Sequence, residues 1–422
     1  MDARNEMLGL LRGRRKDFSL PQAFYVDPEV FRLDLETIWY RDWIFVGHDC
    51  ELDKPGAFFT VQVGDYAIVL VRDLKGTIRA FHNTCRHRGS RVCAADRGST
   101  VRLVCPYHQW SYDLDGRLLF ARQVGEGFDK SAYALKPVAC ESAAGYLFVC
   151  LAGDPPDFAP FRRTMEPYFA PHRLTEAKLA HESTIVERGN WKLVWENNRE
   201  CYHCSANHPE LCKTFPEAPT ATGVQSADSD PEMLELWTRC EQAGLPARFR
   251  IAPSGQFRVT RTPLVRDAVS YTLSGMPAVG RNLSDGVSAE RIGSLMLYHY
   301  PTTWSHVLVD HAVTFRVIPV SANETAVTTK WLVHKDAVEG ADYDLKELIH
   351  VWTETNAQDR RIVEENARGV HSPAYEPGPY STVHEGGVIQ FVDWYARTIG
   401  QRLEGEAAYA GAARRQAVAG PA

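Results

Sequence analysis

Four residues in the first third of the chain have the types and the spacing of metal ligands. They are Cys85, His87, Cys105 and His108, in the order C-x-H, seventeen residues, C-x-x-H. Thiolates and neutral imidazoles both bind borderline transition metals, so two short Cys/His pairs on separate loops can form one compact site with four ligands.

The order of these ligands separates two kinds of metal site. Zinc also takes two cysteines and two histidines, but zinc fingers group Cys with Cys and His with His. Here each loop offers one of each, which favours a Rieske-type [2Fe-2S] cluster with both cysteines on one iron and both histidines on the other. A zinc site stays the alternative. The cysteines predicted to be ordinary core or surface residues are Cys50, Cys93, Cys140, Cys150, Cys212 and Cys240.

A second group of possible ligands lies in "ENNRECYHCSANHPEL", residues 196–211, with Glu200, His203 and His208. The two histidines are five residues apart, which is about 140° around an ideal helix. They can therefore bind one ion only if the helix ends or distorts between them. Pro209 predicts such an end near His208, in a helix that otherwise includes "GNWKLVWENNRECYHCSANHPEL". A histidine pair of this kind is more often structural than ligating, and that interpretation stays open.

A carboxylate would complete this site, and a helix predicted at about 344–369 offers Asp359. It lies seven residues after Trp352, within the apolar stripe, and so points inward. The acidic residues predicted to lie off the stripe are Glu347, Glu354, Glu364 and Glu365. A buried carboxylate must be paired or coordinate a metal. An ion pair or cap contact is the alternative, but two unassigned histidines favour a facial triad of a non-haem Fe(II) oxygenase, which leaves positions open for O2.

The elements that must position these residues change character along the chain. Residues 1–20 are polar and predicted to be mobile, and residues 28–43 form one amphipathic helix. Strand-like stretches follow, including a hairpin through Asp115-Gly116. The predicted domains are an N-terminal segment and helix at 1–43, a Rieske domain at 44–155, a catalytic domain at 156–405 and a disordered tail at 406–422, with the boundary at the Pro-rich stretch 153–161.

Composition excludes several classes of protein. The 422 residues are 44% hydrophobic and 24% charged, with a net charge of -6, as in an ordinary globular protein of two or more domains. The sequence has no basic face that would predict nucleic-acid binding, and none of its apolar runs reaches the ~18 residues of a membrane span. The first residues lack the pattern of a signal peptide, so we expect a cytoplasmic protein. We also expect its ten cysteines to be reduced thiols or metal ligands rather than a disulfide framework.

From about residue 20 to 400 the sequence resembles the Rieske non-haem iron oxygenases. The resemblance rests on "CRHRGS", "CPYHQWSYDLDG", "NWKLVWENNRECYHCSANHP" and "QDRRIVEENARGVHSPAYEPGPYS". It implies an α+β fold, in which an all-β Rieske [2Fe-2S] domain precedes a helix-on-antiparallel-sheet domain that holds mononuclear iron. The implied cluster ligands are Cys85, His87, Cys105 and His108, and the implied iron ligands are His203, His208 and Asp359.

The resemblance also implies how the two metal centres communicate. In this family an aspartate three residues before the first iron histidine connects it to a Rieske histidine of the neighbouring subunit, within a trimer. That position is Glu200 here, one methylene longer, and we assign it the same bridging role. A carboxylate that accepts from both imidazoles sets their tautomers. Asn197 matches a position near the iron. A homotrimer is therefore expected.

The segments "HYPTTWSHVLVDHAVTFRV" and "TTKWLVHKDAVEGADYDL" resemble the branch that removes N-methyl groups from quaternary ammonium compounds. This implies a terminal oxygenase acting on a small betaine, such as glycine betaine or proline betaine. A quaternary cation prefers aromatic faces, and Tyr298, Tyr300 and Trp304 are the candidate substrate residues. The electrons would come from a separate NAD(P)H-dependent flavin and iron-sulfur reductase, because neither G-x-G-x-x-G nor G-x-x-x-x-G-K-[ST] is present.

Three other functions are compared with this one. A Rieske oxygenase of aromatic rings or aryl methyl ethers would have an apolar slot in place of an aromatic cage. A Rieske electron carrier would need only about the first third of the chain and would leave His203, His208 and Asp359 unexplained. A zinc-binding interaction module would be colourless, whereas an oxidised Rieske protein is brown.

Overall fold

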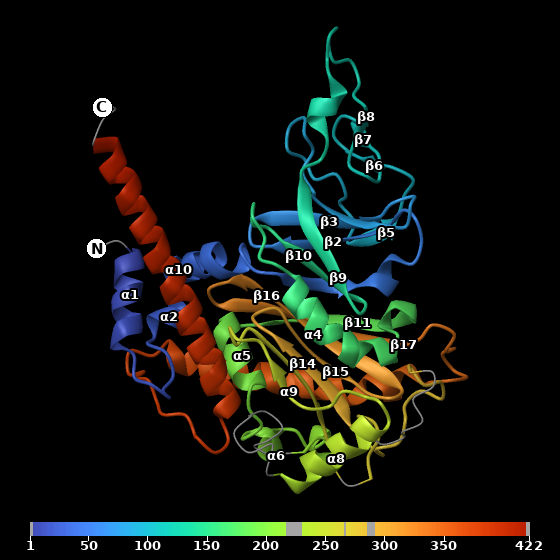
Figure 1. Ribbon diagram of the computed structural model, residues 1–422, viewed down its shortest axis with the longest axis vertical. Coiled ribbons are helices and arrows are strands. Elements are labelled where there is room, and N and C mark those ends of the chain that lie inside the picture. The colour runs from blue at the N-terminus through green and yellow to red at the C-terminus, as the bar shows by residue number, and fades with distance from the viewer. Residues whose placement is uncertain (1–2, 217–229, 266, 285–291, 419–422) are drawn as a thin grey trace.

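Two seven-stranded antiparallel sheets, one in each half of the chain, organise the fold (Figure 1). The computed structural model describes residues 3–216, 230–265, 267–284 and 292–418. In the view of Figure 1 the first sheet lies above the second, and both chain ends lie on the same side of the molecule. This arrangement confirms the predicted α+β fold.

The first sheet has the strand order β1-β10-β9-β4-β3-β2-β5. Its strands are β1 (Ile44–His48), β2 (Ala57–Val63), β3 (Tyr66–Arg72), β4 (Ile78–His82), β5 (Arg97–Ser99), β9 (Pro137–Ala143) and β10 (Tyr146–Cys150). A three-stranded sheet stands at its top in Figure 1, formed by β6 (Leu103–Val104), β7 (Ser111–Tyr112) and β8 (Leu118–Phe120). The turn between β7 and β8 contains Gly116 at φ +89°, which confirms the predicted hairpin.

The second sheet has the order β11-β17-β16-β15-β14-β13-β12 and carries the catalytic half. Its strands are β11 (Ala177–Glu187), β12 (Arg250–Ile251), β13 (Phe257–Thr262), β14 (Ser294–His299), β15 (Thr303–Val307), β16 (His311–Ser321) and β17 (Glu324–His334). Two helices, α5 (Trp191–Asn198) and α9 (Leu345–Val370), contact each other and pack on this sheet. Helix α9 buries Leu348, Val351 and Trp352 at helical spacing, and its Asp359 accepts a hydrogen bond from Asn197 of α5.

The remaining helical elements surround these layers. The α-helices are α1 (Ala3–Gly13), α2 (Ala23–Val26), α3 (Pro28–Asp34), α4 (Ala159–Phe169), α6 (Cys204–Asn207), α8 (Pro231–Gln242) and α10 (Gly386–Val418). The π-helix is η1 (Leu35–Trp39), and the 3-10 helices are η2 (Asp49–Leu52), η3 (Lys130–Tyr133), η4 (Ala170–His172), η5 (Leu174–Glu176) and η6 (Leu211–Lys213). Among the described helices, none combines the length and the apolar character that a membrane crossing would need.

Both chain ends differ from the sequence prediction. The predicted mobile segment 1–20 contains α1, which buries Met7 and Leu8 and contacts α10. The predicted disordered tail at 406–422 begins inside α10, which continues to Val418, and residues 419–422 lie outside the described part of the chain. Alanine is the strongest helix former, so the Ala-rich sequence of this segment supports a helix rather than an irregular tail.

Two hydrophobic clusters connect the halves and secure the catalytic elements. The larger one joins α1–α3, α5, α9 and α10 to one face of the second sheet. The other joins β10 to α4 and the second sheet, where Phe148 lies 5.1 Å from both Phe161 and His299 between ring centroids. The predicted boundary at 153–161 begins after β10 and ends within the first turn of α4, and it stays a prediction.

Candidate functional site

Two loops in the first half repeat one backbone pattern around their cysteines. In each, the amide four residues after the cysteine donates to the cysteine carbonyl: Gly89 to Cys85 at 3.0 Å, and Gln109 to Cys105 at 3.1 Å. Both donor residues have positive φ, +81° and +60°. Glycine adopts such angles freely, whereas Gln109 does so only at a cost in backbone energy. The two loops therefore present their Cys/His pairs in a similar way.

The side chains of these loops divide into buried sulfurs and outward imidazoles. Cys85 and Cys105 are 4% and 1% exposed, whereas His87 and His108 reach the surface. The two imidazole centroids are 4.6 Å apart, and Trp110 stacks on His87 at 4.9 Å. A cluster with one iron on two cysteines and the other on two histidines requires this separation. The structure thus brings together all four residues predicted for the cluster.

The second candidate site surrounds the one-turn helix α6, with His203 before it and His208 after it. Helix α5 already ends at Asn198, so the predicted continuous helix up to His208 is wrong. The Glu200 carboxylate accepts hydrogen bonds from the amides of Tyr202 and His203, and it therefore starts a new turn where a helix would continue. The second helix end, before Pro209, lies where the sequence predicted it.

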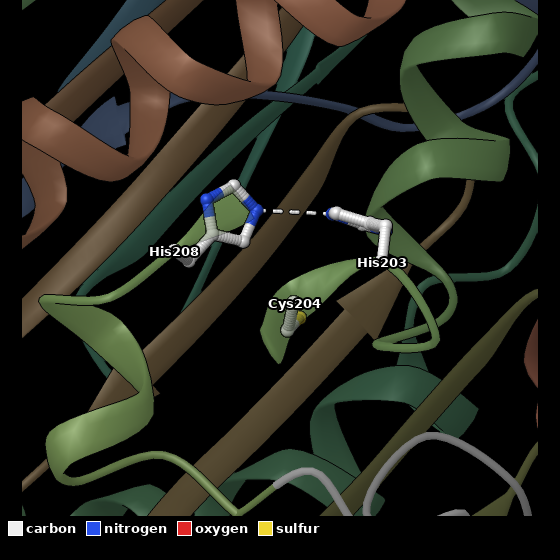
Figure 2. A group of neighbouring side chains, drawn as sticks. All are labelled: His203, Cys204 and His208. Atoms are coloured by element: carbon white, nitrogen blue, oxygen red, sulfur yellow. Dashed lines mark hydrogen bonds between the residues drawn. The ribbon is translucent and has the colours of Figure 1, made fainter. Parts of the chain in front are cut away.

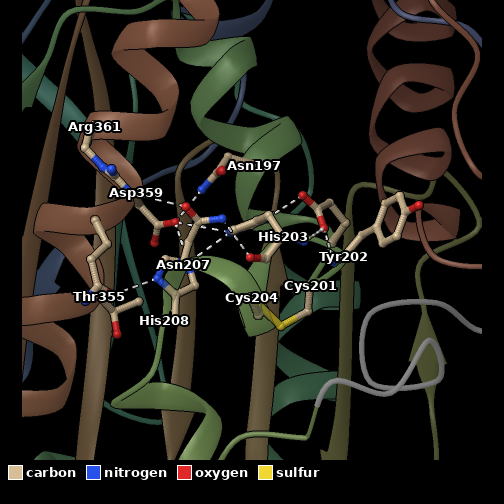
Figure 3. Close-up of polar contacts among 12 residues, drawn as sticks. Asn197, Cys201, Tyr202, His203, Cys204, Asn207, His208, Thr355, Asp359 and Arg361 are labelled. Atoms are coloured by element: carbon tan, nitrogen blue, oxygen red, sulfur yellow. Dashed lines mark hydrogen bonds and ion pairs between the residues drawn. A yellow bond between two sulfur atoms is a disulfide. The ribbon is translucent and has the colours of Figure 1, made fainter.

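Three potential metal-binding atoms converge beside α6 (Figures 2 and 3). The Nε2 atoms of His203 and His208 are 3.0 Å apart. Oδ1 of Asp359 lies 3.0 Å from Nε2 of His208 and 3.4 Å from Nε2 of His203. Ligands at right angles around an ion, with bonds of about 2.1 Å, are about 3.0 Å apart. The triangle therefore fits one face of an octahedral site.

The hydrogen bonds of the two Nδ1 atoms determine which tautomer each histidine adopts. Nδ1 of His203 lies 2.5 Å from Oε1 of Glu200, and Nδ1 of His208 lies 2.8 Å from Oε1 of Gln358. Because Nε2 of Gln358 donates to Glu210 at 2.9 Å, its carbonyl oxygen faces His208. Both Nδ1 atoms are then donors, and both Nε2 lone pairs point at the Asp359 carboxylate. Three electron-rich atoms directed at one point suit a bound cation.

The electrostatics of these residues agree with a cation site. Burial disfavours the imidazolium of His203, but the carboxylates of Asp359 and Glu200 outweigh it and raise the pKa of His203 to about 10. Burial raises the pKa of Asp359, but hydrogen bonds and charge from both histidines outweigh it and hold the pKa of Asp359 well below its usual range. A proton and a metal ion therefore compete for the same ligands.

Supporting residues include two that the sequence suggested and one that it did not. Asn197 donates from Nδ2 to Oδ1 of Asp359 at 2.7 Å, so this residue orients the carboxylate (Figure 3). Glu200 holds His203, as described above. Gln358 holds His208, and sequence reasoning missed it because a glutamine one residue before Asp359 on a helix gives no periodic signal.

A small cavity of about 50 Å³ adjoins the three ligands. Its aromatic lining residues are Phe215, Tyr298, His306 and Trp352. His306 stacks on Trp352 at 4.7 Å between ring centroids, and burial lowers the pKa of His306 to about 3. His306 is therefore neutral near neutral pH, and the wall that it forms with Trp352 is aromatic and uncharged.

The candidate substrate residues divide between this cavity and the core. The described residues that line the cavity include Tyr298 but neither Tyr300 nor Trp304. Strand β14 ends at His299, so the alternation that would put Tyr298 and Tyr300 on one face does not continue. The hydroxyl of Tyr300 accepts from Nε of Arg199 at 2.7 Å, and Trp304 stacks on Phe315 at 5.0 Å. Sequence reasoning missed His306 as a lining residue although it lies within the segment "HYPTTWSHVLVDHAVTFRV", because alternation along β15 does not show which face borders the cavity.

A disulfide between Cys201 and Cys204 lies in the turn that precedes α6 (Figure 3). The expectation of reduced thiols is wrong for this pair. The turn brings the two Cα atoms to 4.9 Å, within the range that a disulfide spans. The signal in the sequence was the C-x-x-C spacing, which is typical of redox-active pairs.

Two protein-family models match the chain. The Rieske [2Fe-2S] domain matches residues 42–129, and the ring hydroxylating alpha subunit (catalytic domain) matches residues 174–401. This chain belongs to the Rieske oxygenase alpha subunits. The oxygenase therefore works with a Rieske [2Fe-2S] cluster, mononuclear iron and O2, and the zinc module and the stand-alone electron carrier are excluded.

Individual relatives give a more detailed comparison than the family models. The oxygenase is 48% identical over 407 residues to the glycine betaine monooxygenase oxygenase subunit of Chromohalobacter salexigens, across 96% of this chain and 91% of the relative. It is 44% identical over 408 residues to the same subunit of Pseudomonas aeruginosa, across 96% and 95%. A solved quaternary ammonium Rieske monooxygenase in complex with gamma-butyrobetaine shares the fold, with a TM-score of 0.69, 22% identity, and coverage of 93% and 98%.

Proposed function

We propose that the oxygenase removes one N-methyl group from glycine betaine and releases formaldehyde and dimethylglycine. The observation that carries this proposal is 44–48% identity, over 96% of the chain, to oxygenase subunits named for glycine betaine. The small aromatic cavity beside the three converging ligands supports it. Proline betaine, the other predicted substrate, also has a quaternary nitrogen and a carboxylate, but its nitrogen is part of a ring and carries two methyl groups.

We propose His203, His208 and Asp359 as ligands of the mononuclear iron, and Cys85, His87, Cys105 and His108 as ligands of the cluster. The iron, when bound, activates O2 for attack on an aliphatic C–H bond. Glu200 and Gln358 keep both histidines in the tautomer with a free Nε2. Asn197 steadies the carboxylate of Asp359.

The aromatic wall is proposed to bind the trimethylammonium group. The ring of Tyr298 already packs against the guanidinium groups of Arg199 and Arg258, at 4.0 and 4.9 Å. The neutral rings of Trp352 and His306 are left to face the cation, and the Trp352 face is worth ~0.5–2 kcal/mol. Their position beside Asp359 would direct one methyl group toward the metal. The cavity of about 50 Å³ beside the three ligands is small compared with the roughly 300–1,000 Å³ of pockets for drug-sized ligands.

The hydroxylation consumes O2, two electrons and two protons. One oxygen atom enters the methyl C–H bond as a hydroxyl, and the other leaves as water. The quaternary N-hydroxymethyl product then loses the hydroxyl proton, and its C–N bond breaks with the electron pair returning to nitrogen. The products are a tertiary amine and formaldehyde, and a separate reductase would supply the electrons.

We propose that the electrons cross between subunits of a homotrimer. In Figure 1, β6–β8 beside the cluster loops lie at the opposite end of the molecule from α6. Each site also presents an exposed aromatic residue, Tyr107 at 56% and Tyr202 at 62% exposure. These would be covered if the cluster of one subunit docked against the Glu200 turn of the next. The cytoplasmic location stays a prediction of the sequence.

A single-turnover assay tests the substrate. The protein, loaded with Fe(II) and chemically reduced without oxygen, is mixed with O2 and one candidate: glycine betaine, proline betaine, carnitine, choline or an aryl methyl ether. Formaldehyde and the demethylated product are measured against the iron content. We expect product from glycine betaine in an amount close to that of the mononuclear iron. Product from none of the ammonium compounds, with both metal centres intact, would overturn the assignment, and product from the aryl ether would support the alternative substrate class.

Mixed oligomers test the path of the electrons. Asp359→Ala removes the proposed iron site and His108→Ala damages the cluster, so neither variant should turn over alone. Purified hetero-oligomers with one intact cluster beside one intact iron site should regain activity. Continued inactivity of assembled hetero-oligomers that contain both centres would refute transfer between subunits, and native mass spectrometry would report the trimer directly.

A further inference from the structure

The Cys201–Cys204 disulfide lies directly beside the proposed iron ligand His203. Figure 3 shows the bond between the two sulfurs below His203, within the same turn. Cys201 and Cys204 are 6% and 3% exposed, and both line the cavity at the proposed iron site. Neither sulfur has a role in the function proposed above.

The sulfur of Cys204 is close enough to become a further metal ligand. Its Sγ atom and one ring nitrogen each of His203 and His208 all lie within 4.8 Å of one another (Figure 2). A tetrahedral site, with bonds of about 2.0 Å to nitrogen and about 2.3 Å to sulfur, has ligand atoms about 3.5 Å apart. A movement of about 1 Å would therefore bring the sulfur into such a site.

The backbone would keep Cys204 in place without the disulfide. Its amide donates to the carbonyl of Cys201 at 3.2 Å, and its carbonyl accepts from the amide of His208 at 2.7 Å. A thiolate binds zinc and other borderline metals strongly, whereas the sulfur of a disulfide has no charge to offer. The disulfide therefore holds a competing ligand away from the proposed iron site.

We propose that Cys201 and Cys204 form a redox control of the mononuclear metal site. Reduction by a dithiol breaks the S–S bond with two electrons and two protons, gives two thiols and leaves the reductant as a disulfide. The thiol of Cys204 then binds a metal at His203 and His208 and releases its proton to solvent. Exchange with a disulfide oxidant takes two electrons and two protons from the thiols, reduces that oxidant to two thiols and restores the ligand set of two histidines and one carboxylate. This inference rests on the ligands proposed above.

Cobalt provides a test that does not depend on activity. The mononuclear iron is exchanged for Co²⁺, and X-ray absorption at the cobalt edge counts sulfur neighbours without interference from the cluster. Four samples are compared: oxidised protein, protein reduced with a dithiol, Cys201→Ser and Cys204→Ser. Mass spectrometry after alkylation reports the thiol content. Cys204→Ser is the matched control, because it also breaks the disulfide but leaves only the Cys201 thiol.

We expect no sulfur around cobalt in the oxidised protein or in Cys204→Ser. We expect one sulfur per cobalt in the reduced protein and in Cys201→Ser. Cobalt with only nitrogen and oxygen neighbours in those two samples would overturn the inference while leaving the ligand set intact. Cobalt without histidine neighbours in any sample would instead refute the proposed ligands. If Cys201→Ser does not fold, the reduced wild-type protein decides.

Discussion

Replacement of Asp359 by alanine is the sharpest test of the proposed iron site. Its Oδ1 atom lies 3.0 and 3.4 Å from the two histidine nitrogens, so it completes the ligand triangle. A carboxylate and an Fe²⁺ ion about 2.1 Å apart attract each other by about 4 kcal/mol even at the dielectric constant of water. Water replaces the lost ligand and offsets part of this energy. We therefore expect the iron affinity to fall about 10²–10³-fold.

Iron content and spectroscopy measure this loss. The wild-type protein should hold about three iron atoms per chain, two of them in the cluster, and Asp359→Ala should hold about two. The reduced Rieske signal in electron paramagnetic resonance should be unchanged, while single-turnover product disappears. Glu365→Ala is the control, because Glu365 lies on the same helix in an exposed ion pair with Arg368 and should keep all three iron atoms. Retention of three iron atoms and full turnover in Asp359→Ala would refute the ligand set.

Three further predictions follow from the surroundings of the site. Glu200→Gln should keep both metal centres but slow cluster reoxidation in a single turnover about 10–100-fold, because the Nδ1–H of His203 loses its charged acceptor. Trp352→Leu should raise the KM for glycine betaine by up to about 30-fold through loss of an aromatic face worth ~0.5–2 kcal/mol. Burial raises the pKa of Glu196 to about 7, although hydrogen bonds from Tyr25 and Tyr380 lower it. A carboxyl whose pKa is raised on folding stabilises the protein fully at low pH, and this stabilisation is lost as the pH rises from about 4.5 to about 7. The free energy of unfolding of Glu196→Gln should therefore rise by about 3 kcal/mol relative to that of the wild type across this interval. Denaturant unfolding at a series of pH values measures the difference.

Each of these predictions has a contrary outcome. An unchanged reoxidation rate in Glu200→Gln would remove this carboxylate from the electron path. Trp304→Leu is the matched control for Trp352→Leu, since Trp304 is equally buried but does not line the cavity; a larger rise of KM in Trp304→Leu would put the cation elsewhere. Parallel pH profiles of unfolding for Glu196→Gln and wild type would show that Glu196 does not titrate in this interval.

The sequence alone determined the features that depend on short spacing. The residue types and order of the two Cys/His pairs identified the cluster loops, because a loop of five residues can be closed by its own backbone hydrogen bonds, as at Cys85 and Cys105. The 3.6-residue period of α9 directed Asp359 toward the histidines, because one face of a helix must be buried. The alternating strands and their turns predicted two antiparallel β-rich units.

Only the tertiary structure decided which residues of different elements come together at the proposed metal site. Helix α5 ends at Asn198 because Glu200 takes the next free amides, and this turn lets His203 and His208 face each other. The cavity wall combines residues of β14, β15 and α9, which are distant in sequence, so no local pattern could have selected His306 and Trp352 from the other aromatic residues. Spacing along a chain specifies contacts within one turn or one helix face, whereas contacts between elements depend on how their apolar faces pack together.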